Sequence, residues 1–162
     1  RDTAGDVVGV AGGERVKGLD PVISVFRSSA TDDAVELYDG DQAAVGDALQ
    51  IVYSAAGAEY GVIFSVDGRG VVTLHHPANL FSSSDLEQGA NVALPYSYVL
   101  DDSPLFERFI FVTSDTELSV GAILDRAEEL AAADPETVRA DGFRGDGVDV
   151  DELTVRKSEE LQ

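Results

Sequence analysis

The chain has 162 residues, of which 44% are hydrophobic and 26% are charged, proportions typical of a globular domain with a sizeable core. Its 31 acidic residues against 11 basic ones give a net charge of −20. We expect no nucleic-acid partner, because phosphate binding depends on clustered Lys and Arg, and the densest basic pair is Arg156-Lys157. The absence of cysteine excludes disulfides, thiol catalysis and zinc–thiolate sites.

The two ends of the chain differ in composition from the rest. Residues 1–14 are small, polar and glycine-rich, which is typical of a flexible linker, and we expect residues 159–162 to form a frayed tail. A single domain is predicted between them, over residues 15–158. No apolar run approaches the roughly 20 residues of a membrane helix, and position 1 is not Met. We interpret the chain as a fragment, with any membrane anchor upstream of Arg1.

The first half of the domain contains short β-branched runs separated by turn residues. Strands are predicted over residues 21–27, 34–38 and 48–54. Two further runs, 58–66 and 71–76, flank the tetrapeptide Asp67-Gly68-Arg69-Gly70. This tetrapeptide predicts a hairpin, because its glycines accept the positive φ of a tight reversal. Pro77 then ends the second run.

The second half changes from strand to helix and back. Strands are predicted over residues 91–100 and 106–113, and Pro95 indicates a sheet edge or a bulge. From Ser119, a good N-cap, apolar residues recur at helical spacing, which predicts an amphipathic helix over residues 119–133. A second short helix is predicted at Asp134-Pro135-Glu136, then a glycine- and aspartate-rich loop over 140–152 and a last strand over 152–157.

These elements predict a mainly β fold. About seven short strands with glycine and proline turns between them favour an antiparallel β-sandwich, Ig-like or barrel-like, with one C-terminal amphipathic helix. We expect that helix to cover one end or edge of the sandwich.

A series of turn residues occurs in the middle of the chain in a characteristic order. Gly46-Asp47, the hairpin turn, Pro77, the stretch from Gly89 to Pro95 and Thr113-Ser114 follow one another within residues 46–115. This part resembles a bacterial family, domain of unknown function 4384, found at the ends of membrane-anchored anti-sigma-like proteins and lipoproteins. The resemblance implies a β-sandwich in the periplasm or otherwise outside the cytoplasm, and it implies no catalytic residues.

The histidines His75 and His76 are the first candidates for metal binding or acid–base chemistry. Neighbouring residues of a regular strand point to opposite faces, so the pair is not expected to hold one metal ion. A third ligand such as Asp85 or Glu87 is not selected by any spacing. We therefore interpret the histidines as residues of a strand end.

Other candidate sites are also weak. Ser82-Ser83-Ser84 lies near the histidines but lacks a nucleophile-elbow sequence, and it is interpreted as a loop. The acidic residues Asp146, Asp149, Asp151 and Glu152 do not have the spacing of an EF-hand, so no dedicated calcium site is indicated. Gly68-Arg69-Gly70 is too short for a phosphate loop.

The strand from Phe106 carries an acidic and a basic residue among aromatic ones. Glu107 and Arg108 should face opposite sides, with one of them half-buried in a structural ion pair. An aromatic platform for carbohydrate or peptide is conceivable, but at strand spacing we expect core residues at Tyr53, Tyr96, Tyr98, Phe106, Phe109 and Phe111.

We therefore predict a non-catalytic extracytoplasmic sensor or interaction domain of a larger membrane-anchored bacterial protein. The alternatives are a small hydrolase centred on His75 and His76, and a calcium-stabilised structural domain. We assign no catalytic, cofactor-binding or metal-ligating residue and expect no cofactor. The expected partner is an unidentified protein or small molecule, with membrane contact only through a segment upstream of this chain.

Overall fold

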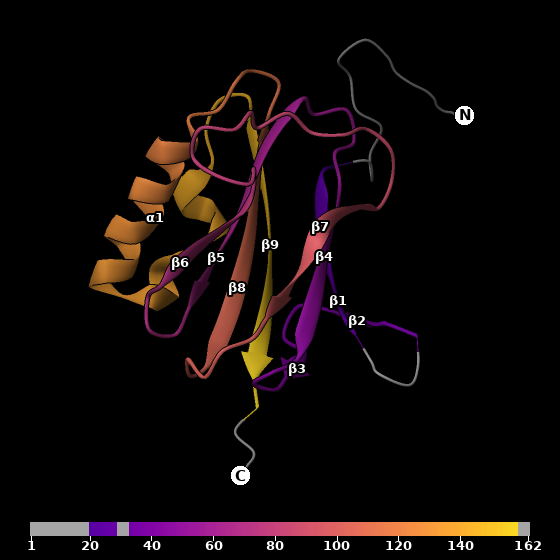
Figure 1. The fold of residues 1–162 in the computed structure, drawn as a ribbon. Helices are drawn as coiled ribbons and strands as arrows, with labels where there is room; N and C mark the ends of the chain where they lie inside the picture. The colour runs from indigo at the N-terminus through magenta and orange to yellow at the C-terminus, as the bar shows by residue number, and fades with distance from the viewer. Residues whose placement is uncertain (1–19, 29–32, 159–162) are drawn as a thin grey trace.

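The computed structural model describes residues 20–28 and 33–158, within which nine strands form two sheets that face each other (Figure 1). The first sheet has the order β2-β1-β4-β7, built from Val35–Leu37, Val22–Arg27, Ala48–Ser54 and Val92–Val99. The second has the order β3-β9-β8-β5-β6, built from Gln42–Ala43, Val148–Lys157, Phe106–Ser114, Tyr60–Asp67 and Val72–His76. The predicted β-sandwich is confirmed, and the sheets remain separate rather than closing into a barrel. The predicted linker, tail and start of the domain lie outside the described residues.

Helix α1, Val120–Ala133, adds a third layer on the outer face of the second sheet (Figure 1). Strand β8 is buried along its whole length, because its alternate side chains enter two different cores. Phe109 and Phe111 pack between the sheets, whereas Phe106 and Ile110 pack under the helix. The expectation that the helix covers an end or edge is wrong. An apolar outer sheet face needs a covering layer, and the helix supplies it.

Local signals account for the boundaries of the helical region. Ser119 caps α1, its Oγ accepting the amide of Ala122 at 3.2 Å. Asp134 ends α1 and caps the short 3₁₀ helix Pro135–Thr137 by accepting the amide of Glu136 at 3.0 Å. Both helices agree with the sequence prediction. A further 3₁₀ turn, Ala140–Phe143, follows before β9.

The cap on α1 has a measurable consequence. Ser119→Ala removes the acceptor of the Ala122 amide, and we expect the free energy of unfolding to fall by about 1 kcal/mol. Ser119→Asp keeps an acceptor and should remain close to the natural chain. Urea denaturation followed by circular dichroism measures both, and an equal loss in the two variants would contradict this role of the hydroxyl.

Two strand predictions need correction. Strand β9 begins at Val148 rather than Glu152, because residues 148–151 pair with β8. Asp151 is held in the sandwich, where its carboxylate accepts the amide of Ile23 at 2.9 Å. Strand β3 has only two residues and pairs in parallel with β9, so it has no sequence pattern of its own. The strands therefore number nine, not about seven, within the described residues.

The predicted hairpin between β5 and β6 is present, but its two glycines serve different purposes. Gly70 has a φ of 87° and so needs the conformational freedom of glycine, as predicted. Gly68 does not have a positive φ. A Cβ on Gly68 would lie 2.0 Å from the carbonyl oxygen of Pro104, so close approach of a second loop requires this glycine.

Candidate functional site

Two β-bulges on the edge strands β6 and β7 shape the candidate site. In β6 the register against β5 places one extra residue, His75, between the partners of Ile63 and Phe64. In β7 residues 94–96 lie opposite Ile51 alone. Pro95 therefore occupies both a bulge and a sheet edge, and its prediction is confirmed. Bulges commonly redirect side chains at sheet edges.

The β6 bulge overturns the expectation that His75 and His76 face opposite sides. The His75 ring lies 4.6 Å from the ring of Tyr98 and 5.6 Å from that of Phe109. The His76 ring lies 6.0 Å from the ring of Tyr53. All three partners belong to the inter-sheet layer. The extra residue breaks the alternation of the strand and turns both imidazoles inward.

The two bulges enclose a pocket of about 280 Å³, which we name the β6–β7 pocket. Residues 75–78 form one wall, residues 92–96 form the other, and segment 82–87 together with Tyr53 completes it. Tyr96 joins the two edge strands, its hydroxyl donating to the carbonyl of His75 at 2.5 Å. The hydroxyl of Tyr53 accepts the amide of Glu87 at 2.9 Å. The pocket walls are therefore held together by hydrogen bonds.

The lining of the β6–β7 pocket is aromatic and acidic. His76 Nε2 lies 3.1 Å from the carbonyl oxygen of Asp85, and since a carbonyl only accepts, Nε2 carries the proton. Burial lowers the pKa of His76, so its imidazole is neutral at neutral pH. Asp85 and Glu87 are exposed, and no Lys or Arg occurs among the lining residues. Tyr96, 40% exposed, lies on the pocket wall rather than in the core.

His75 connects this pocket to a buried polar cluster that comprises Ser65, His75, Tyr98, Glu107 and Lys157. Ser65 Oγ donates to Glu107 Oε2 at 2.7 Å and lies 2.8 Å from His75 Nε2. Tyr98 donates to the same carboxylate oxygen at 3.2 Å. Lys157 Nζ lies 3.4 Å from Glu107 Oε1, the carboxylate oxygen without a hydrogen-bond donor. The cluster links four strands of the second sheet, β5, β6, β8 and β9, to β7.

The hydrogen bond between Ser65 and His75 runs in the opposite direction from that between a catalytic serine and its histidine base. The single hydroxyl hydrogen of Ser65 is directed to Glu107, so Ser65 accepts its bond from His75 Nε2–H. A catalytic histidine would instead accept the serine proton on that nitrogen. Ser65 and Glu107 are both 0% exposed, so substrate has no path to the hydroxyl. In this arrangement the histidine orients the serine rather than activating it.

The prediction that Glu107 and Arg108 face opposite sides of the sheet is confirmed, but the burial is greater than expected. Glu107 faces the inter-sheet space, whereas Arg108 faces the helix layer, where its Nε donates to Thr154 Oγ1 at 2.9 Å. Both side chains are buried, not one of them. Sequence reasoning missed Ser65 and Lys157. The available signals were a lone serine within the apolar β5 run and a lysine in phase with buried residues of β9.

Burial lowers the pKa of His75 from 6.5 to about 4, which makes stability depend on pH. The unfolded chain takes up the proton first, so stability is lost as pH falls through 6.5 toward about 4 and changes no further below. Between about pH 7 and pH 4 we expect this loss to be about 2 to 3 kcal/mol. Chemical denaturation at a series of pH values measures it. The non-titrating His75→Gln variant should show a shallower dependence by that amount, and equal slopes would contradict the assignment.

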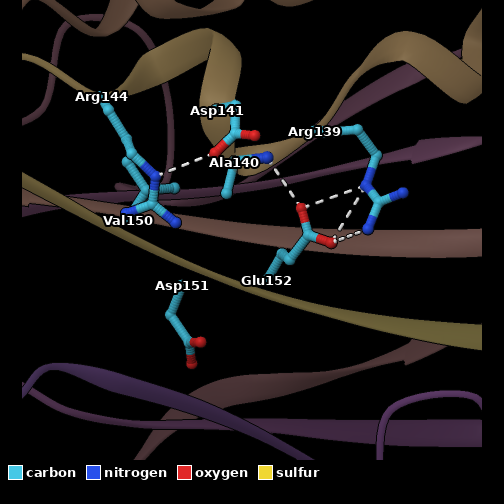
Figure 2. A pocket seen from close by; sticks show the side chains of 7 residues that line it. All are labelled: Arg139, Ala140, Asp141, Arg144, Val150, Asp151 and Glu152. Carbon is cyan, nitrogen blue, oxygen red and sulfur yellow. Dashed lines mark hydrogen bonds and ion pairs between the residues drawn. The ribbon is translucent and has the colours of Figure 1, made fainter.

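Three acidic residues around the start of β9, Asp141, Asp151 and Glu152, each have a different partner. In the pocket of about 400 Å³ shown in Figure 2, Glu152 pairs with Arg139, and Asp141 pairs with Arg144 at 3.1 Å. Asp151 points away from both pairs, toward the first sheet (Figure 2).

A different set of carboxylates does approach closely. Oxygens of Asp67, Asp101 and Glu107 lie within 4.8 Å of one another. Lys157 Nζ lies 3.0 Å from Asp101 Oδ1 and 3.4 Å from Glu107 Oε1. The ammonium group already supplies positive charge to this set. We therefore interpret these carboxylates as part of a structural ion-pair network.

Comparison with protein-family models, with curated proteins and with solved structures finds no match to this chain. The resemblance noted from the turn residues therefore stays a prediction. No helix of the described residues combines the length and apolar character that a membrane span requires.

Proposed function

We propose that this chain is a non-catalytic binding domain and that the β6–β7 pocket is its contact site. The observation that carries the proposal is the pair of facing bulges, which opens an aromatic pocket between two sheet edges. Pockets of this kind, mainly apolar with a few placed polar groups, are the usual sites of ligand binding. As the sequence resemblance implies, we further propose that it acts outside the cytoplasm as a sensor or interaction module of a larger membrane-anchored bacterial protein.

The hydrogen-bond pattern of the buried polar cluster supports a binding function rather than a catalytic one. The Ser65 hydroxyl is bonded to both the imidazole and one oxygen of the carboxylate, and all three side chains are buried. Those groups stabilise the sandwich beneath the pocket, and they leave the pocket itself with a neutral His76 and two exposed carboxylates. Such a surface is suited to recognition by a partner.

The pocket assignment is tested by filling the pocket. We expect indole, used as an aromatic probe, to shift the backbone NMR signals of residues 75–78 and 92–96. Ala93→Trp places a large side chain on the pocket wall and should abolish these shifts. Val99→Trp, on the same strand, replaces a residue that is 57% exposed and outside the pocket, so it should leave them unchanged. Shifts that persist in Ala93→Trp would place the site elsewhere.

The hydrolase alternative rests on the 2.8 Å contact between Ser65 Oγ and His75 Nε2. It predicts hydrolysis of p-nitrophenyl acetate that disappears in Ser65→Ala. The binding proposal expects the natural chain and this variant to hydrolyse the ester at the same rate. That rate should be no higher than the background from the buffer and from nonspecific reaction with exposed side chains. A rate lost specifically in Ser65→Ala would decide for the hydrolase.

A further inference from the structure

The charges around the β6–β7 pocket indicate what kind of group it accepts. Asp85 and Glu87 are exposed on its lining, and neither carboxylate forms an ion pair or a side-chain hydrogen bond within residues 20–28 and 33–158. The net charge of the whole chain is −20, so the surroundings of the pocket are also negative on average. A cation is therefore attracted to this pocket and an anion is repelled from it.

The pocket of Figure 2 provides an internal comparison. Its carboxylates are also near the surface, but Glu152 is paired with Arg139 and Asp141 with Arg144. Two of the three carboxylates that line that pocket are therefore paired with arginines. Neither carboxylate of the β6–β7 pocket forms an ion pair with the described residues, 20–28 and 33–158, although this pocket is the more aromatic of the two.

The rings of the pocket favour a flat cation over a compact one. Tyr96 and His76 are each held by a hydrogen bond to a backbone carbonyl, so their rings lose little freedom when a ligand binds. A guanidinium group is planar, stacks on aromatic faces and is more weakly hydrated than an ammonium group. It also donates several hydrogen bonds at once to carboxylates, here those of Asp85 and Glu87.

We propose that the β6–β7 pocket receives an arginine side chain of a partner protein. This inference rests on the proposed function, since it identifies the group that enters the same pocket. The acidic surface steers a basic partner toward the domain, and the aromatic walls hold the guanidinium group together with the carboxylates of Asp85 and Glu87.

NMR titration of the isotope-labelled chain with three blocked tripeptides tests this inference. The central residue is arginine, its neutral analogue citrulline, or lysine. We expect the arginine peptide to bind about tenfold more tightly than the citrulline peptide, because charge-assisted hydrogen bonds are lost in the latter. Asp85→Asn with Glu87→Gln should remove that difference. Asp125→Asn with Glu128→Gln removes the same charges from the exposed face of α1 and should change the affinity by less than about twofold.

Each outcome separates the inference from the proposed function. Equal binding of arginine and citrulline peptides at the pocket overturns the arginine assignment but keeps the pocket as a contact site. Equal binding of the lysine peptide overturns the preference for a guanidinium group. If no peptide shifts the pocket signals, but indole still shifts them and Ala93→Trp abolishes those shifts, the arginine inference is wrong and the proposed function is retained. If indole also fails, both fall.

Discussion

Glu107→Ala is expected to lower the free energy of unfolding by about 3 to 5 kcal/mol, because it breaks a buried ion pair from one side. Glu107 is 0% exposed, and the side chain of its partner Lys157 is 3% exposed. The substitution removes the acceptor of Ser65 and Tyr98 and leaves the ammonium group with Asp101 only. Guanidinium chloride denaturation followed by fluorescence and circular dichroism measures the loss.

An exposed ion pair provides the control for this substitution. Arg69 and Asp102 lie 3.0 Å apart, but their side chains are 55% and 78% exposed. Asp102→Ala should therefore cost less than about 1 kcal/mol. Glu107→Gln keeps one acceptor oxygen and provides a measurable intermediate if the alanine variant does not fold. Equal costs for Glu107→Ala and Asp102→Ala would show that the buried polar cluster does not contribute to stability.

Gly68→Ala is expected to destabilise the chain by about 3 kcal/mol or more, because its Cβ has no room. The nearest atom, the Pro104 oxygen, would be 2.0 Å away. That oxygen cannot move freely, since it accepts the amide of Phe106, a residue that is 1% exposed. The β5–β6 hairpin and the β7–β8 connection would have to separate. Thermal unfolding and chemical denaturation both report this cost.

The same substitution at Gly121 should raise the free energy of unfolding instead of lowering it. Gly121 lies in the first turn of α1, and a Cβ there meets nothing within 4 Å. Alanine lowers the conformational entropy of the unfolded chain and favours the helix, so Gly121→Ala should stabilise by about 0.5 kcal/mol. A tolerated Gly68→Ala, within about 1 kcal/mol of the natural chain, would mean that the two loops do not approach as closely as described.

The predictable part of the fold rests on short-range physics. The cap at Ser119 and the helical spacing that follows it involve neighbours in the chain, and α1 was found where they indicated. Pro95 signals an edge because proline lacks the amide that a second neighbouring strand would need. The start of β9 was missed because Asp149 and Asp151 look like loop residues until β8 is placed beside them.

The candidate site was less predictable because its contacts are long-range. Ser65 and Glu107 are 42 positions apart, and neither residue indicates the other. The orientation of His75 and His76 depends on how β6 pairs with β5, a register that the two residues do not encode locally.

The sequence alone therefore determined the sandwich, its helix, the acidity and the lack of thiol chemistry, all of which follow from composition and local periodicity. Only the tertiary structure decided that both histidines turn inward, that Ser65 and Lys157 join Glu107, and that a pocket opens between β6 and β7. These features arise from strand register and from the packing of distant segments, where burial, not spacing, selects the contacts.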